Sequence, residues 1–314
     1  MTLTLPTPAN RLKIGTRGSP LALIQAHETR ARLMEAFDLA ADAFEIKVIK
    51  VTGDIVQDRP LKDIGGKGLF TREIEEALLA GEIDIAVHSM KDMPVEQPPG
   101  LTIDCYLPRE DVRDAFVSLS HQRLAVLPQG AVVGTSSLRR RAQLLNRRPD
   151  LSVVEFRGNV QTRLRKLNDG VAQATFLAMA GLNRLGADDV PRTAIEPDDM
   201  LPAIAQGAIG IERRGDDMST ADLLAAIHDA ITGQRLVAER AFLAALDGSC
   251  ETPIAGLAEL DGGTLHLRGE ILRTDGSEAL ADAADCAIED GADLGRAMAE
   301  KLLARAGDGF FDWR

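Results

Sequence analysis

The sequence lacks the features expected of a membrane, secreted or metal-binding protein. No run of eighteen apolar residues occurs in the 314-residue chain, so no segment is predicted to span a membrane. Residues 1–10 lack the charged and apolar parts of a signal peptide and are expected to form a loose tail. The three cysteines show neither the paired spacing of a zinc site nor a disulfide framework. We therefore expect a cytoplasmic protein with free thiols and no metal.

Aromatic residues are also scarce, at 4% of the chain, with one Trp and one Tyr. Nucleic-acid-binding domains normally combine a basic surface with aromatic side chains that stack on bases. Here the net charge is −12 and the pI is near 5.0, a balance that repels a polyanion. We therefore expect no nucleic-acid partner. The 45% hydrophobic content and the length predict two or three ordinary globular domains.

One stretch reverses the acidic balance. Residues 134–166 contain eight arginines and Lys166 against only Asp150 and Glu155, a local surplus of +7 that leaves −19 (−12 − 7) for the rest of the chain. Three explanations compete: a basic helix face in water, a nucleic-acid surface, or a pocket for a ligand with many carboxylates or phosphates. Arginine suits the pocket, because its planar guanidinium pairs bidentately with carboxylates and stays charged.

The local pattern favours the pocket. Residues 134–137 (GTSS) follow an apolar run and precede a helical pattern, which predicts a strand-to-helix turn whose N–H groups can bind anions. Arg139 and Arg140 fall in the first turn of that helix, where the helix dipole disfavours cations, and this cost suggests a ligand. A second predicted strand, residues 151–156, ends at Arg157. We expect such strand ends to bring arginines to one edge of a sheet, where open α/β folds bind ligands.

Two further arginines are also expected near the ends of strands. Arg163 lies on the helix expected after the Gly-Asn turn at residues 158–159, and Arg184 follows the strand expected over residues 174–180. Residues 201–207, which include Gln206, are predicted to cross back toward another strand over residues 208–212.

The first hundred residues show related chemistry with fewer charges. A strand over residues 12–15 leads to Arg17, and Ser19 before a proline marks the start of a helix. A buried strand over residues 83–87 ends in the polar cluster HSMKD, residues 88–92. Such a cluster is either a simple turn with a satisfied histidine and a surface salt pair, or a set of catalytic groups at a strand end.

The loop over residues 52–68 is predicted to be a mobile, charged lid. Its Gly-Gly-Lys-Gly sequence, with Lys67, resembles a phosphate loop but lacks the spacing and hydroxyl residue of a Walker motif. A helix is expected directly after it, over residues 70–80, and a strand before it, over residues 45–51.

The last third of the chain predicts a small α+β domain. Two helices, short strands around two glycine turns and a closing helix are expected over residues 221–231, 234–246, 261–263, 275–277 and 293–306. Cys250 lies in a turn with glycine and serine and is expected to be accessible, which a reactive thiol requires, although most accessible cysteines are inert. Cys105 and Cys286 are expected to be buried.

Seven motifs, taken together and in this order, resemble the porphobilinogen deaminase (hydroxymethylbilane synthase) family. The resemblance covers nearly the whole chain. The motifs are TRGSPLA (16–22), GGKGLF (65–70), VHSMKD (87–92), GTSSLRR (134–140), RGN (157–159) with Arg163, AGL (180–182) with Arg184, and GSC (248–250).

The resemblance implies an α/β fold with two α/β domains like those of periplasmic binding proteins and a smaller α+β C-terminal domain. Domain 1 is expected over residues 1–107 and 208–225, domain 2 over residues 113–201, and domain 3 over residues 230–314. It further implies that guanidinium groups from separate turns line one cleft, with Cys250 holding a dipyrromethane cofactor through a thioether. The implied partners are porphobilinogen as substrate and, transiently, the next enzyme of haem biosynthesis, with a monomer as the expected state.

The resemblance also assigns roles to residues that match the motifs. Asp92 is the expected catalytic carboxylate, which stabilises the cation formed when porphobilinogen loses ammonia. Porphobilinogen carries an acetate and a propionate, so burying the growing product requires cationic partners. Besides Cys250, the expected cofactor-binding residues are Lys91, Ser137, Arg139, Arg140, Arg163 and Arg184. The expected substrate-binding residues are Arg17, Ser19, Lys67, Arg157 and Gln206.

Two positions depart from the family pattern. Some members have a second lysine in the lid where this chain has Asp63, with Lys62 one place earlier, so Lys67 is the better candidate for a carboxylate contact. Ala205 stands before Gln206 where glycine is common, which we expect to stiffen the crossing. The alternative function is a non-catalytic receptor for small anions on the same two-lobed fold, which would need the arginines but neither Asp92 nor a modified Cys250.

Overall fold

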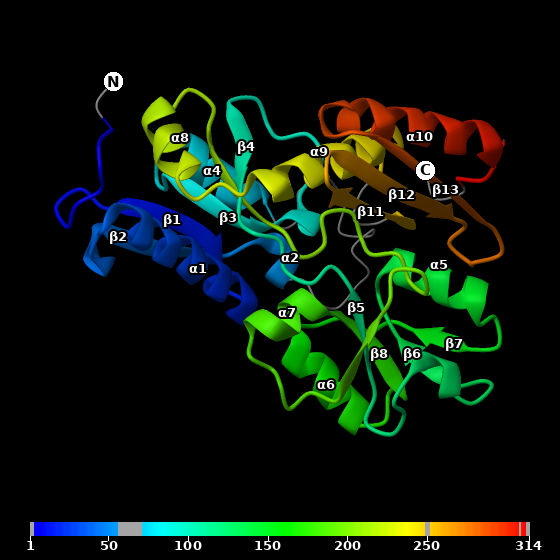
Figure 1. The fold of residues 1–314 in the computed structure, drawn as a ribbon. Coiled ribbons are helices and arrows are strands. Elements are labelled where there is room, and N and C mark those ends of the chain that lie inside the picture. The colour runs from blue at the N-terminus through cyan, green and yellow to red at the C-terminus, as the bar shows by residue number, and fades with distance from the viewer. Residues whose placement is uncertain (1–2, 56–70, 249–251, 308, 312–314) are drawn as a thin grey trace. The chain divides into compact units, whose positions relative to one another are not determined.

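The computed structural model describes residues 3–55, 71–248, 252–307 and 309–311 (Figure 1). The chain divides into two compact units. Unit 1 comprises Met1–Glu110 and Ala208–Gly233, and unit 2 comprises Asp111–Gly207 and Gln234–Arg314. The three expected domain boundaries stay predictions.

Unit 1 is built on a five-stranded sheet in the order β2-β1-β3-β10-β4. The strands are β1 (Leu12–Arg17), β2 (Phe44–Ile49), β3 (Ile85–Ser89), β4 (Leu101–Tyr106) and β10 (Ile209–Arg214). Strand β1 pairs in parallel with β2 and β3, whereas β10 runs antiparallel to β3 and β4. The parallel strands β1 and β3 therefore end at the same edge of the sheet.

Helices cover both faces of this sheet. The helical elements are α1 (Pro20–Phe37), η1 (Ala41–Ala43), α2 (Thr52–Ile55), α4 (Arg72–Leu79), η2 (Met90–Asp92) and α8 (Met218–Ala225). Apolar residues of α1 and α8 pack in one core with Ile85, Val87, Ile209 and Ile211 of the sheet. Residues of α4 pack in a second core with Ala86 on the opposite face. Because alternate residues of a strand point to opposite faces, β3 and β10 present Ala86, His88 and Glu212 to α4.

Unit 2 contains a second five-stranded sheet in the order β7-β6-β8-β5-β9. Its strands are β5 (Asp114–Val117), β6 (Val132–Gly134), β7 (Ser152–Val154), β8 (Ala174–Ala178) and β9 (Arg192–Ile195). Strand β6 is parallel to β7 and β8, and β5 is antiparallel to β8 and β9. The helical elements between them are η3 (Leu124–Val126), α5 (Leu138–Arg147), α6 (Val160–Asn168) and α7 (Met179–Arg184). Helix α5 packs on one face of the sheet, and α6 and α7 pack on the other.

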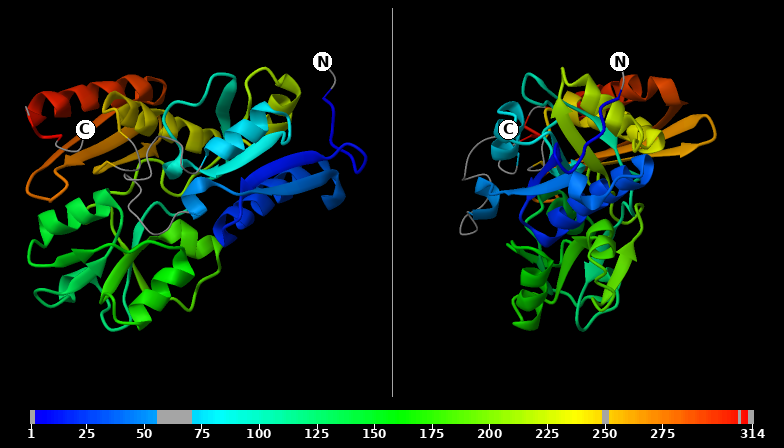
Figure 2. Two further views of the ribbon diagram at one scale, coloured as in Figure 1. Left: turned by 180° about the vertical axis from the view of Figure 1, so that it is seen from behind. Right: turned by 90° about the vertical axis from the view of Figure 1, so that its left-hand side faces the viewer.

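The C-terminal part of unit 2 is a three-stranded antiparallel sheet with two long helices. The strands are β11 (Ile254–Asp261), β12 (Thr264–Leu272) and β13 (Ala279–Ala287), and the helices are α9 (Ala230–Ala245) and α10 (Gly291–Ala306), with the short η4 (Ile288–Asp290) before α10. Both views in Figure 2 show α10, in red, lying along the orange strands. Gly295 allows α9 and α10 to touch, because a Cβ there would meet the Ala238 carbonyl oxygen at 2.4 Å.

The fold confirms an α/β protein with a smaller C-terminal sheet. The seven strands predicted for the two five-stranded sheets are found within a few residues of their expected bounds. Two details were wrong. The break expected between helices at residues 231–234 lies at residues 226–229 instead, because the Asp229 carboxylate accepts a hydrogen bond from the Thr232 N–H (2.8 Å) at the start of α9. Cys286 is only partly buried, because it lies on the edge strand β13, whereas Cys105 is buried as expected.

Ala205 adopts a left-handed backbone conformation, with φ of 60°. Its N–H donates to Glu239 Oε2 (2.7 Å), and the other oxygen of this buried carboxylate accepts from the Ala258 N–H (2.8 Å). Glu239 thus fixes the backbone of Ala205 in a region that costs an alanine about 1–2 kcal/mol. The departure from glycine at this position therefore produces local strain.

Replacing Ala205 with glycine should remove this strain. Glycine also has more conformational freedom in the unfolded chain, which costs about 0.5–1 kcal/mol, so we expect Ala205→Gly to raise the free energy of unfolding by about 0.5 kcal/mol. Urea denaturation measures the change. The control Ala226→Gly, at an exposed residue with φ of −70°, should lower stability instead. A loss of stability in Ala205→Gly would contradict the strain argument.

Candidate functional site

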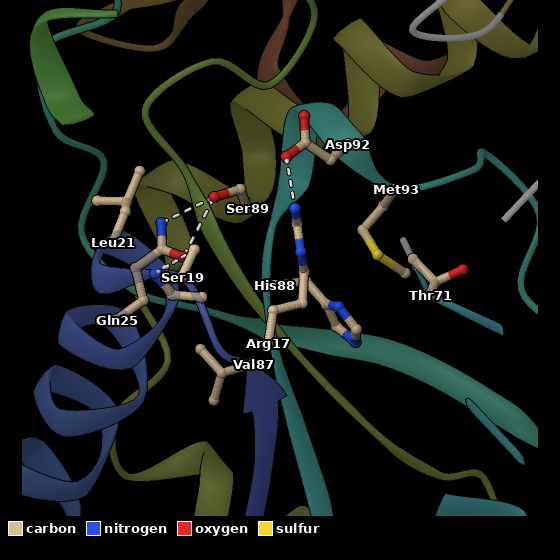
Figure 3. A pocket seen from close by; sticks show the side chains of 11 residues that line it. Arg17, Ser19, Leu21, Gln25, Thr71, Val87, His88, Ser89, Asp92 and Met93 are labelled. Atoms are coloured by element: carbon tan, nitrogen blue, oxygen red, sulfur yellow. Dashed lines mark hydrogen bonds and ion pairs between the residues drawn. The ribbon is translucent and has the colours of Figure 1, made fainter. Parts of the chain in front are cut away.

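The described part of unit 1 has a pocket at the carboxyl ends of β1 and β3 (Figure 3). Arg17 is the last residue of β1, and Ser89 is the last residue of β3. Open α/β sheets bind ligands at this edge. The lining residues are Arg17, Ser19, Leu21, Ala22, Gln25, Thr71, Val87, His88, Ser89, Asp92 and Met93.

Arg17 and Asp92 face each other in this pocket. Arg17 Nη1 lies 3.8 Å from Asp92 Oδ2, and the two side chains are 22% and 35% exposed. Figure 3 shows the Arg17 side chain extended toward the carboxylate. This distance is an ion pair rather than a short hydrogen bond, so the Asp92 charge is only loosely compensated by Arg17. The negative charge can therefore act on a cation in the pocket.

Polar side chains of α1 complete this edge of the pocket. The Ser19 hydroxyl accepts a hydrogen bond from the Ala22 N–H (3.2 Å) and caps the helix, and Pro20 follows as its first residue. Gln25 Nε2 donates to Ser89 Oγ (2.8 Å), which joins α1 to the end of β3. The N-cap was predicted from the sequence, but Gln25 was not, because its partner lies 64 residues away.

The VHSMKD motif divides between two environments. Lys91 and Asp92 lie in η2, the single helical turn after β3, and both are partly exposed. His88 lies within β3, is buried, and places Nε2 3.0 Å from Glu212 Oε2. His88 therefore has a buried partner, as the satisfied-histidine explanation expects, and both His88 and the partly exposed Asp92 line the pocket. Glu212 was not predicted, although a charged residue within an apolar strand is a signal that could have found it.

The arginines of unit 2 gather at the carboxyl ends of β6, β7 and β8. The Ser137 hydroxyl caps α5 by accepting from the Arg140 N–H (3.4 Å), as its position before the helix predicted. Arg139 and Arg140 follow in the first turn, and they are only 4% and 6% exposed. The explanation of a basic helix face in water is therefore wrong for these two residues.

Asp114, at the start of β5, lies between these two guanidinium groups. It is fully buried, and its oxygens lie 2.7 Å from Arg139 Nη2 and 2.6 Å from Arg140 Nη2. Burial alone would raise the pKa of Asp114, but the two positive charges hold it well below its usual range. Sequence reasoning missed Asp114, because its partners follow about 25 residues later on another element.

Two further arginines and Gln206 contact backbone at the same edge. Arg163 donates from Nε to the Gly158 carbonyl oxygen (2.9 Å) and from Nη1 to that of Phe176 (3.3 Å). Loss of hydration, together with the positive charge of Arg140, lowers the pKa of Arg163 to about 10. Arg184 donates to the carbonyl oxygen of the residue after Gln206 (3.0 Å).

Gln206 joins the same group of polar side chains. Its Nε2 donates to the Val112 carbonyl oxygen (2.7 Å) and lies 3.1 Å from Asp114 Oδ1. Arg140 also donates to the Phe176 carbonyl oxygen (2.9 Å), the acceptor that it shares with Arg163. Arg157 is partly buried just after β7. Unit 2 thus brings together Ser137, Arg139, Arg140, Arg163 and Gln206.

Lys67, Cys250 and most of the expected lid lie outside the described residues. The placement of the guanidinium groups in one cleft and the roles assigned to individual residues stay predictions. In the described ranges, no helix has the length and apolar character needed to cross a bilayer. Within those ranges, no three His, Cys, Asp or Glu side chains form a group that could hold a metal ion.

Two family models match most of the chain. "Porphobilinogen deaminase, dipyromethane cofactor binding domain" matches residues 12–222, and "Porphobilinogen deaminase, C-terminal domain" matches residues 234–304. Among solved structures, the periplasmic VFT2 domain of BvgS from Bordetella pertussis covers 69% of this chain and 86% of its own at 14% identity, with a TM-score of 0.39. At that score the likeness decides nothing about the fold, which rests on the two sheets.

Curated relatives match over nearly the full length. The porphobilinogen deaminase of Paracoccus denitrificans is 71% identical over 309 residues, which cover 98% of this chain and 99% of that protein. The chloroplastic porphobilinogen deaminase of Pisum sativum is 53% identical over 307 residues, which cover 96% and 83% of the two chains. Together with the family models, this similarity shows that the chain belongs to the porphobilinogen deaminase family.

Proposed function

We propose that this chain joins four porphobilinogen molecules head to tail with loss of ammonia and releases hydroxymethylbilane by hydrolysis. Its membership of the porphobilinogen deaminase family supports this activity. The observation that supports it best within the structure is the excess of buried and partly buried positive charge at the sheet edge of unit 2.

The charges in this cluster do not balance. Arg139, Arg140 and Arg163 are matched by the single carboxylate of Asp114. Three arginines and one aspartate leave a surplus of two positive charges. The neighbouring Arg147 and the buried Glu270, whose closest atoms are 3.6 Å apart, cancel each other and do not change this surplus. Guanidinium groups in a water-poor environment are costly unless anions meet them. A ligand with several carboxylates offsets this cost, and porphobilinogen supplies an acetate and a propionate on each ring.

A dipyrromethane cofactor fits the same donors. Arg139 Nε is enclosed and has no hydrogen-bond partner among the described residues, so one donor of this guanidinium group is unsatisfied there. We propose that Arg139, Arg140, Arg163 and Arg184, with Ser137 and Lys91, hold the cofactor carboxylates. When bound, the cofactor supplies the pyrrole end on which the product is built. Arg17, Ser19, Arg157, Lys67 and Gln206 are proposed to contact the substrate carboxylates.

Asp92 is proposed to stabilise the cation that forms when porphobilinogen loses ammonia. Its carboxylate is partly exposed in the pocket and lies 3.8 Å from its arginine partner, so it keeps a charge that can act on substrate. Asp92 also receives and returns protons in this proposal, whereas Arg17 orients a substrate carboxylate beside it. A receptor for small anions would not need this carboxylate.

Replacing Asp92 with asparagine keeps the shape and removes the charge. We expect Asp92→Asn to lower kcat for release of ammonia from porphobilinogen by at least about 100-fold, because one preorganised electrostatic contact contributes roughly that much. The thermal unfolding midpoint should not change. Asp42→Asn, at an exposed residue of η1, is the matched control and should keep full activity. Near-normal turnover by Asp92→Asn would contradict the catalytic role and favour a receptor.

Cys250 is proposed to hold the cofactor through a thioether. Its thiolate would attack the same kind of electrophile that chain growth uses, so no separate loading enzyme is required. Cys105 is a poor alternative, because it is buried and burial raises the pKa of its thiol to about 12. Cys286 is accessible in part, but burial and neighbouring carboxylates raise its pKa too.

Intact-protein mass spectrometry tests this attachment. The purified chain should be heavier than its sequence by one dipyrromethane, and Cys250→Ser should abolish the adduct. Cys286→Ser should retain it and serves as the control. An unmodified wild-type chain that still consumes porphobilinogen, or an adduct that persists in Cys250→Ser, would rule out this cysteine.

Asp114 is proposed to fix the positions of Arg139 and Arg140 for their ligands. Its folded-state pKa lies below the unfolded value of about 3.9, so ionised Asp114 contributes stability above that pH. This contribution is lost as pH falls toward the folded pKa. Breaking a buried pair typically costs about 3–5 kcal/mol, because it leaves uncompensated charges.

We therefore expect Asp114→Asn to lower the free energy of unfolding by about 3–5 kcal/mol at pH 7. The difference from wild type should shrink as pH falls below about 4, because the carboxylate of the unfolded wild-type chain then becomes protonated, which favours the unfolded state. Denaturant titrations across pH measure both quantities. Asp188→Asn, which breaks an exposed pair with Arg192, should change stability little. A constant difference from pH 7 to pH 3 would contradict the charge argument.

The transferase class, the monomeric state, the cytoplasmic location and transient contact with the next pathway enzyme are proposed with this function. The location rests on the cysteine pattern and on the lack of an apolar span or signal-peptide pattern, and the other three rest on the family resemblance of the seven motifs.

A further inference from the structure

Three titratable side chains that the proposed function does not use meet beside the unit 1 pocket. His88 lies on β3, Glu212 on β10 and Glu75 on α4, and they are 5%, 0% and 8% exposed. His88 Nε2 is 3.0 Å from Glu212 Oε2. Because His88 also lines the pocket, this buried cluster borders the space that Arg17 and Asp92 face.

The strand register explains how the cluster forms. His88 pairs with Gly210 and Ala86 pairs with Glu212 across the antiparallel strands, so all four lie on one face of the sheet. Ala86 packs in the core that α4 covers. Glu75 extends from α4 into the same layer, where Glu212 and His88 act on its carboxyl group electrostatically. The helix and the two strands thus enclose three titratable groups together.

This layer is arranged to hold a proton. Glu212 Oε1 is enclosed and has no hydrogen-bond partner in the part of the chain that the structure describes. Burial raises the pKa of Glu75, and the negative charge of Glu212 raises it further. Two carboxylates and a neutral imidazole would leave two buried negative charges, so a proton shared among the three groups lowers the cost. A cluster that only supported packing would not require this arrangement.

The proposed reaction releases a proton at each coupling step. The bond between the methylene carbon and nitrogen of porphobilinogen breaks, and its electron pair leaves with ammonia. A carbon–carbon bond then forms to a free pyrrole carbon, which loses its proton to a base as the ring regains aromaticity. The base later gives this proton to ammonia or water. Asp92 can receive this proton but must pass it to a second group before the next coupling step, because a protonated Asp92 has no charge to stabilise the next cation.

If the chain acts as proposed above, we infer that His88 is the proton acceptor of the unit 1 pocket, with Glu212 fixing its tautomer and Glu75 sharing the proton. An imidazole that donates from Nε2–H to a carboxylate presents Nδ1 as an acceptor. The imidazolium formed by proton uptake is then paired with ionised Glu212. The charged and titratable groups that face His88 are Glu212 from β10, Glu75 from α4, and Arg17 and Asp92 across the pocket.

The test compares His88→Gln, Glu212→Gln and the control His27→Gln at an exposed residue of α1. Each cofactor-loaded variant is assayed for ammonia release from porphobilinogen across pH. His88→Gln should lower kcat about 100-fold, with KM within about twofold, and should lose the acid limb of the pH profile, because that limb reports protonation of the base. Glu212→Gln should move the acid limb to lower pH, because the imidazolium loses its anionic partner. His27→Gln should match wild type.

A second measurement does not depend on activity. The ring signals of the histidines are followed by NMR across pH in wild type and Glu212→Gln, and assigned with the His88→Gln and His27→Gln variants. The His88 signal should titrate, and its midpoint should fall in Glu212→Gln. An unchanged acid limb in His88→Gln, or a His88 signal that does not respond to Glu212→Gln, would overturn the inference. If wild type releases no ammonia, the proposed function fails instead, while the NMR result still decides whether the cluster exchanges a proton.

Discussion

Buried positive charge is the constraint on which the functional part of unit 2 depends. Arg139 and Arg140 lie at a helix start, where the dipole opposes them, and they have almost no access to water. Asp114 makes this arrangement possible by pairing with both guanidinium groups from the start of β5. Since one carboxylate cannot balance three arginines once Arg163 is included, the described residues at this edge have a surplus of positive charge. In the proposed function, a substrate whose carboxylates increase in number with each added unit would offset that surplus.

The two five-stranded sheets share one order of parallel and antiparallel strands, but their polar edges have different charges. In each, three parallel strands are followed by an antiparallel strand and an edge strand, so polar residues after the parallel strands meet at one edge. In unit 1 the described residues at this edge include Arg17, Lys91 and Asp92 beside a buried His88. In unit 2 the same edge has several guanidinium groups. We infer that unit 1 is suited to chemistry on a cation, whereas unit 2 is suited to holding anions.

Local signals predicted most strands of the two five-stranded sheets, the helix caps at Ser19 and Ser137, and the gathering of arginines, because each depends on residues close together in sequence. Strands β4, β5 and β9 were not predicted. Asp114 was missed because its partners lie on another element, and the sequence does not report that pairing. Glu212 is a charged residue in an apolar strand, which is a signal, but its partner His88 lies 124 residues away. The prediction that Cys286 is buried was wrong because the sequence does not show that its apolar strand lies at the edge of a sheet. The family motifs supplied the roles of individual residues, which periodicity and charge could not assign.

The environments of Asp92, which is partly exposed, and Asp114, which is buried, explain why the two aspartates should have different roles. Asp114 is fully enclosed and touches two guanidinium groups at 2.6–2.7 Å, so its charge is already compensated and can stabilise nothing further. Asp92 is 35% exposed, and its arginine partner is 3.8 Å away. Electrostatic catalysis requires a charge that is fixed in place but still available to the reacting group. Of these two carboxylates only Asp92 meets both conditions, which is why the structure supports a catalytic role for Asp92 and a positioning role for Asp114.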